Sequence, residues 1–203
     1  MNSEATVFVV DDDEAVRGAI ARLLKSVDLR AETFVSAEDF LSRVQPEMVG
    51  CLVLDMRMPG IGGLALQEEL AARKNSLPII FITGHGDVPT AVRAMKASAF
   101  DFLEKPFVDQ ELLDKIRDAI NLHIGRRREE KRRNEIAVRV RSLTPREREV
   151  MEMIVDGKSN KVVAADLGIS EKTVQTHRTR IMDKMQTRSV ATLAKMVLKE
   201  GPQ

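Results

Sequence analysis

Acidic side chains follow two apolar runs in the first half of the sequence. Residues 7–10 lead into Asp11 and Asp12, and residues 51–54 lead into Asp55. Carboxylates that gather in one place repel one another unless a cation joins them or protons are retained. Mg²⁺, or another divalent cation such as Mn²⁺, suits such a group because it prefers carboxylate and backbone oxygens and completes its octahedron with a phosphoryl oxygen.

Two further apolar runs end in polar residues with a complementary chemistry. Residues 79–82 lead into Thr83, and residues 100–103 lead through a glutamate into Lys105. A lysine supplies a point positive charge, and a threonine hydroxyl can donate to an oxygen of a phosphoryl group. The set therefore suits the transfer of a phosphoryl group onto the Asp55 carboxylate.

These residues need a parallel sheet to bring them together. Apolar runs without alternation are typical of strands that are covered on both faces, and parallel strands place functional side chains at their carboxyl ends. Helical patterns separate the strands, so the first 123 residues predict a doubly wound α/β domain with a five-stranded parallel sheet. The expected strands are residues 6–10, 30–34, 51–55, 79–82 and 100–103, and the expected helices are residues 14–26, 37–44, 64–72, 88–97 and 109–123.

The charge distribution indicates a second domain. Residues 1–124 contain 13 Lys and Arg against 20 Asp and Glu, whereas residues 125–203 contain 19 against 11. A basic half suggests a nucleic-acid partner. Residues 125–141 carry eight basic and three acidic residues and predict a solvated helical linker, with contact to DNA phosphates as a secondary role.

The basic half has a purely helical pattern. Thr144, with Glu147 three residues later, predicts a capping box at the start of a first helix. Ser159 and Ser170 predict the starts of a second and a third helix, separated by a break at Gly168. A last helix is expected over residues 189–199. Two short helices, a turn with glycine and a longer polar helix predict a helix-turn-helix within an all-α four-helix domain.

Several classes of protein are disfavoured by composition. The single cysteine, Cys51, excludes an internal disulfide, and Trp and Tyr are absent, which makes aromatic stacking of bases an improbable mode of binding. No run approaches the roughly 20 apolar residues of a membrane span, and no signal sequence is evident. We therefore expect a cytoplasmic protein without a membrane partner.

Residues 5–123 resemble the receiver domains of two-component response regulators. The stretches VVDDD, LDMRMPGIGG, ITGHGD and FLEKPF carry the resemblance, in the family's order and spacing. The resemblance implies a flavodoxin-like strand order, phosphorylation of Asp55 by a sensor histidine kinase, and a cis bond before Pro106. It further implies that Asp11, Asp12, Asp55 and the Arg57 carbonyl hold Mg²⁺, that Thr83 and Lys105 contact the phosphoryl group, and that Phe102 is the aromatic residue of the switch.

Residues 143–199 resemble the helix-turn-helix domain of the LuxR/FixJ/NarL class, and the combination with a receiver is the FixJ type. The implied organisation is a receiver over residues 1–123, a linker over 124–142 and a DNA-binding domain over 143–203. The implied function is transcriptional regulation by phosphorylation, with double-stranded DNA, a second copy of the chain and RNA polymerase as candidate partners. Such a chain is not an enzyme beyond promoting its own phosphorylation and dephosphorylation.

The third helix of this domain is expected to enter the major groove of DNA. Val174, Ile181 and Met185 form its apolar side, which leaves the polar side for the nucleic acid. Many relatives carry Lys and Asn at the positions of Gln175 and Thr179, so the DNA sequence recognised is expected to differ. Candidates for base edges are Gln175, Thr176 and Thr179, and candidates for phosphate contact or helix support are Lys172, Thr173, His177, Arg178, Arg180 and Lys184.

Two alternatives stand beside this interpretation. One is a phosphatase with Asp11 as nucleophile and Asp13 as acid/base; the other is a helical protein-binding module in place of the DNA-binding domain. For the coupling of the halves, we hypothesise that phosphorylation favours a dimer through the helix 88–97 and the strand after it. The alternative is the release of a masked DNA-binding domain.

Overall fold

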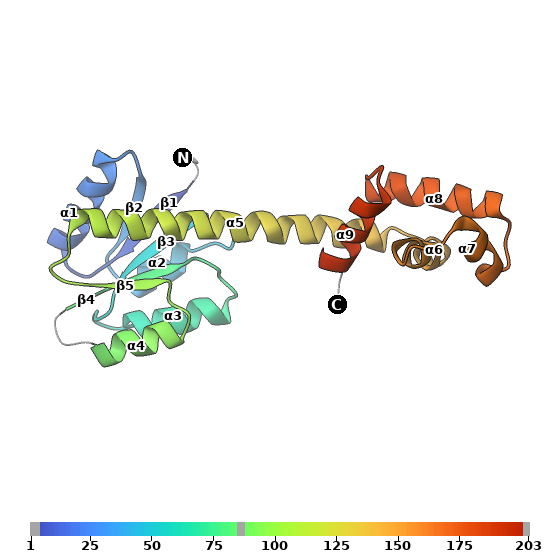
Figure 1. The fold of residues 1–203 in the computed structure, drawn as a ribbon. Coiled ribbons are helices and arrows are strands. Elements are labelled where there is room, and N and C mark those ends of the chain that lie inside the picture. The colour runs from blue at the N-terminus through green and yellow to red at the C-terminus, as the bar shows by residue number, and fades with distance from the viewer. Residues whose placement is uncertain (1–4, 85–87, 201–203) are drawn as a thin grey trace. The chain divides into compact units, whose positions relative to one another are not determined.

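The computed structural model describes residues 5–84 and 88–200, and its N-terminal part is built on a five-stranded parallel sheet (Figure 1). The strand order β2-β1-β3-β4-β5 confirms the predicted doubly wound arrangement. The strands are β1 (Thr6–Val10), β2 (Arg30–Phe34), β3 (Gly50–Asp55), β4 (Ile79–Thr83) and β5 (Asp101–Glu104).

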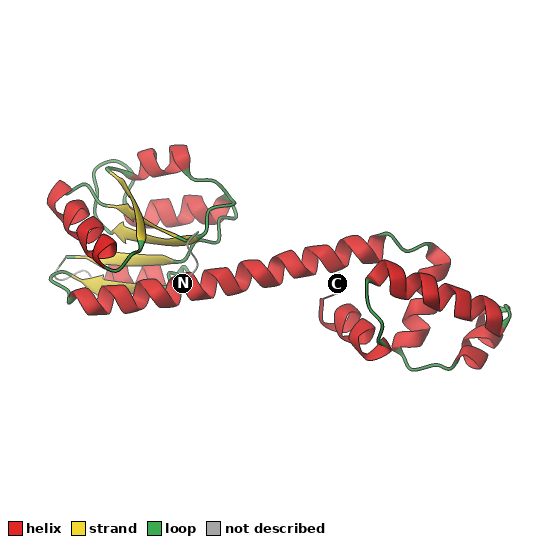
Figure 2. Cartoon of the chain, turned by 90° about the horizontal axis from the view of Figure 1, so that it is seen from above, coloured by secondary structure: helices red, strands yellow, loops and turns green. Residues whose placement is uncertain are grey.

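Helices cover both faces of the sheet, as Figure 2 shows. The helices α1 (Glu14–Ser26) and α5 (Asp109–Arg141) contribute to the apolar cluster on one face. The helices α2 (Ala37–Arg43), α3 (Gly63–Ala72) and α4 (Val88–Lys96) contribute to the cluster on the other. Neighbouring strand residues divide between the two clusters, Val53 on one face and Leu54 on the other, so the apolar runs without alternation reflect burial on both sides.

Helix α5 is longer than the helix predicted over residues 109–123. It continues without a break through Gly125 and the basic stretch to Arg141 (Figure 1). Residues with high helix propensity, mostly Arg, Lys and Glu, fill this part of the chain. Ile136 and Val140 near its end are buried in the apolar cluster of the C-terminal part, which stabilises the continuation.

The chain divides into two compact units, residues 1–126 and 127–203, and the division falls within α5. The expected helical linker, residues 124–142, is helical up to residue 141, where it continues α5. Its second half contributes core residues to the C-terminal unit. None of the helices in the described ranges has an apolar stretch of the length that crossing a membrane requires.

The C-terminal unit contains the helices α6 (Pro145–Val155), α7 (Asn160–Leu167), α8 (Glu171–Met185) and α9 (Val190–Glu200). The predicted capping signals are confirmed: the side chains of Thr144, Ser159 and Ser170 accept the hydrogen bonds that begin α6, α7 and α8. Gly168 ends α7 in the left-handed conformation, with φ 64°, which glycine adopts without strain. Local sequence signals thus define this helix-turn-helix.

Candidate phosphoacceptor site and DNA-binding helix

Asp11 and Asp55 meet at the carboxyl edge of the sheet because β1 and β3 are adjacent and parallel, with Val10 paired to Leu54. The Lys105 ammonium, which follows β5, reaches both carboxylates. Its Nζ lies 2.9 Å from Oδ2 of Asp11 and 2.6 Å from Oδ1 of Asp55. Strand ends that are far apart in the sequence thereby converge on one nitrogen atom.

Local contacts hold the Asp55 side chain in place. Its Oδ2 accepts a 2.8 Å hydrogen bond from the backbone N–H of Arg57. The start of α3 packs closely against the same residue, since a Cβ added to Gly63 would lie 2.6 Å from the Asp55 carbonyl oxygen. The Asp55 side chain is held between these contacts and is largely buried.

The ionisation of the site reflects burial and mutual contact. Burial raises the pKa of the Asp55 carboxyl, and the charge of Asp11 adds to this rise, whereas Lys105 offsets only part of it. Burial lowers the pKa of the Lys105 ammonium, but its hydrogen bonds to Asp55 and Asp11 outweigh this effect and raise it. The expected cis bond between Lys105 and Pro106 is present.

Thr83 and Phe102 lie on the two neighbouring strands. Ile82 is the partner of Asp55 in the β3–β4 register, so Thr83 ends β4 one residue beyond it. Thr83 is buried, and its hydroxyl donates to the carbonyl of Gly84 at 3.2 Å. Phe102, the residue predicted to be the aromatic of the switch, is 39% exposed. Residues 85–87 of the ITGHGD stretch lie outside the described residues.

The carboxylates at this edge fit a divalent cation. Within residues 5–84 and 88–200, no three His, Cys, Asp or Glu side chains form a group that could hold a metal ion. Asp11 and Asp55 do converge, however, and Asp12 beside them is exposed. Mg²⁺ in proteins takes one or two carboxylates and completes its shell with waters and phosphate oxygens. Asp11 and Asp55, with Asp12 beside them, therefore fit such a cation.

The polar side of α8 carries the predicted DNA contacts. Val174, Ile181 and Met185 are buried as predicted, and His177 and Arg178 are partly buried. Two of the threonine hydroxyls are held by their own helix, because Thr176 donates to the Lys172 carbonyl and Thr179 to the Gln175 carbonyl. Their methyl groups and the acceptor lone pairs of their oxygens remain for a base. The exposed members of the predicted set are Lys172, Thr173, Gln175, Thr176, Thr179 and Arg180.

Lys184 has a partner inside its own domain. Its Nζ donates to the buried Glu147 carboxylate at 2.6 Å and to the Ser142 carbonyl at 3.1 Å. This pair ties α8 to the capping box of α6, where Glu147 also accepts from the Thr144 N–H. The ammonium is thus occupied, and we expect Lys184 to contribute less to DNA than the exposed residues of α8.

Two family comparisons cover most of the chain. Residues 7–117 match the response regulator receiver domain, and residues 141–197 match the LuxR family of bacterial regulatory proteins. The chain is a response regulator with a LuxR-family DNA-binding domain. This membership supports the transcriptional interpretation and sets aside both the phosphatase and the protein-binding module. Asp13, the acid/base of the phosphatase alternative, instead caps α1 by accepting from the N–H groups of Ala15 and Val16.

Full-length relatives share this organisation. The chain is 46% identical to nodulation protein W of Bradyrhizobium diazoefficiens, over 96% of this chain and 86% of that one. It is 45% identical to the transcriptional regulatory protein FixJ of Azorhizobium caulinodans, over 99% and 95%. Its structure resembles that of the response regulator StyR with a TM-score of 0.90 at 48% identity, over 97% of this chain and 99% of that one.

Some contacts within the two units carry no signal in the sequence. Arg17 donates to the Asp11 carbonyl at 2.7 Å and so supports the end of β1. His123 is buried and contacts Gly50 through Nδ1 and Ser76 through Nε2, at 3.2 Å and 3.3 Å. The pairing of Glu147 with Lys184 spans 37 positions.

Proposed function

We propose that Asp55 accepts a phosphoryl group from a sensor histidine kinase and that this event controls transcription through α8. The observation that carries the proposal is the convergence of Asp11 and Asp55 on the Lys105 ammonium. A nucleophilic carboxylate beside a second carboxylate and a positive charge suits phosphoryl transfer.

Each residue of the site has a role in this proposal. Lys105 moves its hydrogen bond from the Asp55 carboxylate to a phosphoryl oxygen, and Thr83 turns its hydroxyl to another. The carboxylates of Asp11, Asp12 and Asp55, with the Arg57 carbonyl, would hold Mg²⁺, or Mn²⁺ in its place, and the cation would supply neutralisation of charge on the transferring group. The chain then promotes only its own phosphorylation and dephosphorylation.

Labelling with acetyl phosphate tests the phosphoacceptor. We expect the full chain to incorporate one phosphoryl group in the presence of Mg²⁺ and the Asp55→Asn variant to incorporate none. The matched variant Asp13→Asn keeps a helix cap and is expected to label normally. A label that persists in Asp55→Asn but disappears in Asp11→Asn would place the nucleophile at Asp11 and overturn the proposal.

For DNA recognition, we propose that the exposed side of α8 lies in the major groove. Gln175 suits adenine, although its Oε1 accepts a hydrogen bond from Asn160 at 3.0 Å and must exchange it or use its own N–H₂ group. The methyl groups of Thr176 and Thr179 suit thymine. Proposed contacts to phosphate or to the helix itself come from Lys172, Thr173, His177, Arg178, Arg180 and, more weakly, Lys184.

For the coupling of the two halves, we propose a dimer through α4 and β5. These elements carry large apolar residues that are partly exposed. Val92 is 48% exposed, Met95 40% and Phe102 39%. Inward rotation of Phe102 after phosphorylation would change this surface. The charged residues Arg93, Lys96, Asp101 and Glu104 offer both signs for a two-fold contact, although Asp101 is already paired with Lys115 of α5. RNA polymerase is a candidate partner of the DNA-bound dimer.

The proposal assigns the receiver to residues 1–123 and the DNA-binding domain to residues 143–203. Residues 124–142 join the two, and all but the last of them belong to α5. An uninterrupted helix transmits rotation or separation of its ends better than a flexible segment does, so a change of the receiver's association would reach the second domain through α5.

A further inference from the structure

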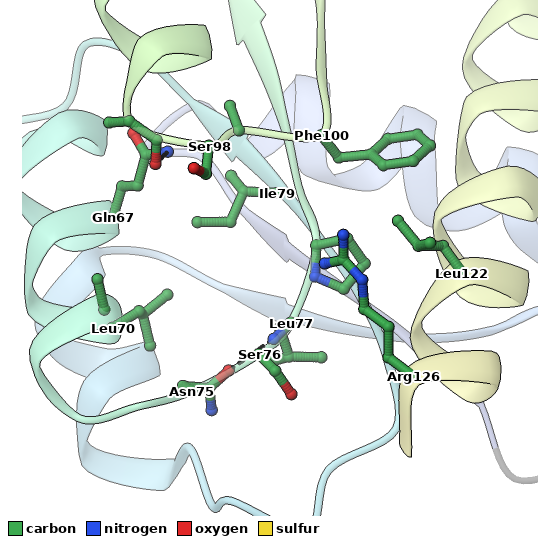
Figure 3. A pocket seen from close by; sticks show the side chains of 14 residues that line it. Gln67, Leu70, Asn75, Ser76, Leu77, Ile79, Ser98, Phe100, Leu122 and Arg126 are labelled. Atoms are coloured by element: carbon green, nitrogen blue, oxygen red, sulfur yellow. Dashed lines mark hydrogen bonds between the residues drawn. The ribbon is translucent and has the colours of Figure 1, made fainter. Parts of the chain in front are cut away.

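The N-terminal unit contains an open pocket at the opposite edge of the sheet from Asp55. It has a volume of about 460 Å³ and is lined by α3, the residues that lead into β4, the connection between α4 and β5, and α5 (Figure 3). Asp55, Thr83 and Lys105 lie at or beyond the carboxyl ends of their strands, whereas the pocket lies at the amino ends of β4 and β5. It is therefore separate from the phosphoacceptor site.

Gln67 of α3 brings an unsatisfied acceptor to this pocket. Its side-chain nitrogen donates to the carbonyls of Ala94 and Ala97, at 3.2 Å and 2.9 Å. These two bonds determine the orientation of the amide, because the reverse orientation would set its oxygen against two other oxygens. The Oε1 atom is buried and has no hydrogen-bond partner, and Gln67 as a whole is only 5% exposed. A buried acceptor without a donor costs free energy that a ligand donor would recover.

Arg126 supplies a cation to the same pocket from α5. Its side chain extends toward the strand that begins at Ile79, as Figure 3 shows. It is exposed and forms no ion pair with any residue in the described ranges. The pocket is also lined by apolar side chains, among them Leu70, Ile79 and Phe100, and by the polar side chains of Asn75, Ser76 and Ser98. The volume falls within the roughly 300–1,000 Å³ of pockets that bind small molecules.

We propose that this pocket binds a small organic acid that carries a hydroxyl or N–H donor at a distance from its carboxylate. The carboxylate contacts Arg126, and the apolar body lies against Leu70, Ile79 and Phe100. The donor reaches the Oε1 of Gln67 when the side chains that cover this buried atom move aside. Such a molecule touches α3 and α5 together, and it approaches the end of α4 that Gln67 holds.

A titration of the full chain with 4-hydroxybenzoate, followed by amide NMR shifts, tests this site. We expect saturable shifts at residues of the pocket and a Kd on the order of 1 mM for a ligand of this size. Benzoate lacks the donor and 4-hydroxybenzyl alcohol lacks the carboxylate, so each is expected to bind about tenfold more weakly.

Two variants and a matched control localise the binding. Arg126→Gln is expected to weaken binding of 4-hydroxybenzoate about tenfold, and Arg128→Gln, at an exposed arginine of the same helix that does not line the pocket, is expected to leave it unchanged. Ala71→Trp, at an exposed position on the rim, is expected to fill the pocket and abolish binding while the remaining spectrum is retained. Binding unaltered by Arg126→Gln and Ala71→Trp, or no shifts in the pocket, would refute the site, and equal binding of benzoate would refute the donor requirement.

Discussion

The ammonium of Lys105 donates a 2.6 Å hydrogen bond to the carboxylate of Asp55, which joins the end of β5 to the end of β3 across the intervening strand β4. The same nitrogen contacts Asp11 at 2.9 Å. A cation or a phosphoryl group that enters the site must therefore share these carboxylates with Lys105. This competition is expected to weaken the binding of a cation, and that effect can be measured.

Mg²⁺ that binds the folded receiver is expected to raise its free energy of unfolding. At a concentration about ten times the Kd, the free energy of unfolding should rise by about 1.4 kcal/mol. Lys105→Gln removes the competing ammonium and is expected to tighten Mg²⁺ binding, whereas Asp11→Asn is expected to abolish most of the stabilisation. Thermal unfolding with and without Mg²⁺ measures both effects, and weaker Mg²⁺ binding in Lys105→Gln would contradict the competition.

Gly63 is expected to be required for the stability of the receiver because no larger residue fits at its position. An added Cβ would meet the Asp55 carbonyl at 2.6 Å and the Phe81 ring at 3.0 Å, so Gly63→Ala should destabilise the receiver by about 1–3 kcal/mol through overpacking. Its labelling by acetyl phosphate should fall as Asp55 moves. Gly125→Ala is the control, because its Cβ would meet no atom within 4 Å, and it is expected to stabilise the helix by about 0.5–1 kcal/mol. Denaturant unfolding compares the two.

The Glu147 carboxyl is expected to make the C-terminal domain sensitive to acid. Its hydrogen bond from Lys184, with that from the Thr144 backbone, lowers its pKa from 4.5 to about 2. A carboxyl with a depressed pKa contributes stability above its unfolded value, so this contribution should be complete above pH 4.5 and lost as the pH falls toward 2. Hydrogen exchange of α6 and α8 amides in the full chain should show this loss, and Glu147→Gln should flatten the dependence.

Contacts between α8 and DNA phosphates are expected to appear in the salt dependence of binding. Arg178→Gln should reduce the slope of log K against log salt by about one unit. Arg30→Gln is the control, since Arg30 lies on β2 and pairs with Glu32. Fluorescence anisotropy of a labelled operator across a salt series measures the slope. An unaltered slope in Arg178→Gln would remove this residue from the phosphate contacts.

Phosphorylation is expected to shift the chain from monomer to dimer. Beryllofluoride, as a mimic of the phosphoryl group, should increase the mass measured by sedimentation, and Phe102→Ala should weaken this response. A shift from mostly inactive to mostly active requires about 5 kcal/mol of differential stabilisation. A mass that stays constant at all concentrations would instead favour release of a masked DNA-binding domain.

Local features of the chain determined most of the fold in advance. The strands β1, β3, β4 and β5 follow from apolar runs, and α6, α7 and α8 begin at the predicted caps, because such signals act over one turn of a helix or one strand. The gathering of Asp11, Asp55 and Lys105 also followed from parallel strand topology. Their order along the chain was sufficient, since parallel strands bring their carboxyl ends to one edge.

Tertiary structure decided what depends on contacts between distant positions. The continuation of α5 past residue 123 rests on the burial of Ile136 and Val140 against helices that follow much later. The burial of Glu147 gives Lys184 an internal partner, so a residue predicted to contact DNA also holds its own domain together. The free oxygen of Gln67 arises because the middle of α3 meets the end of α4 in space. Sequence patterns report local preference, whereas these features come from packing that only the folded chain brings about.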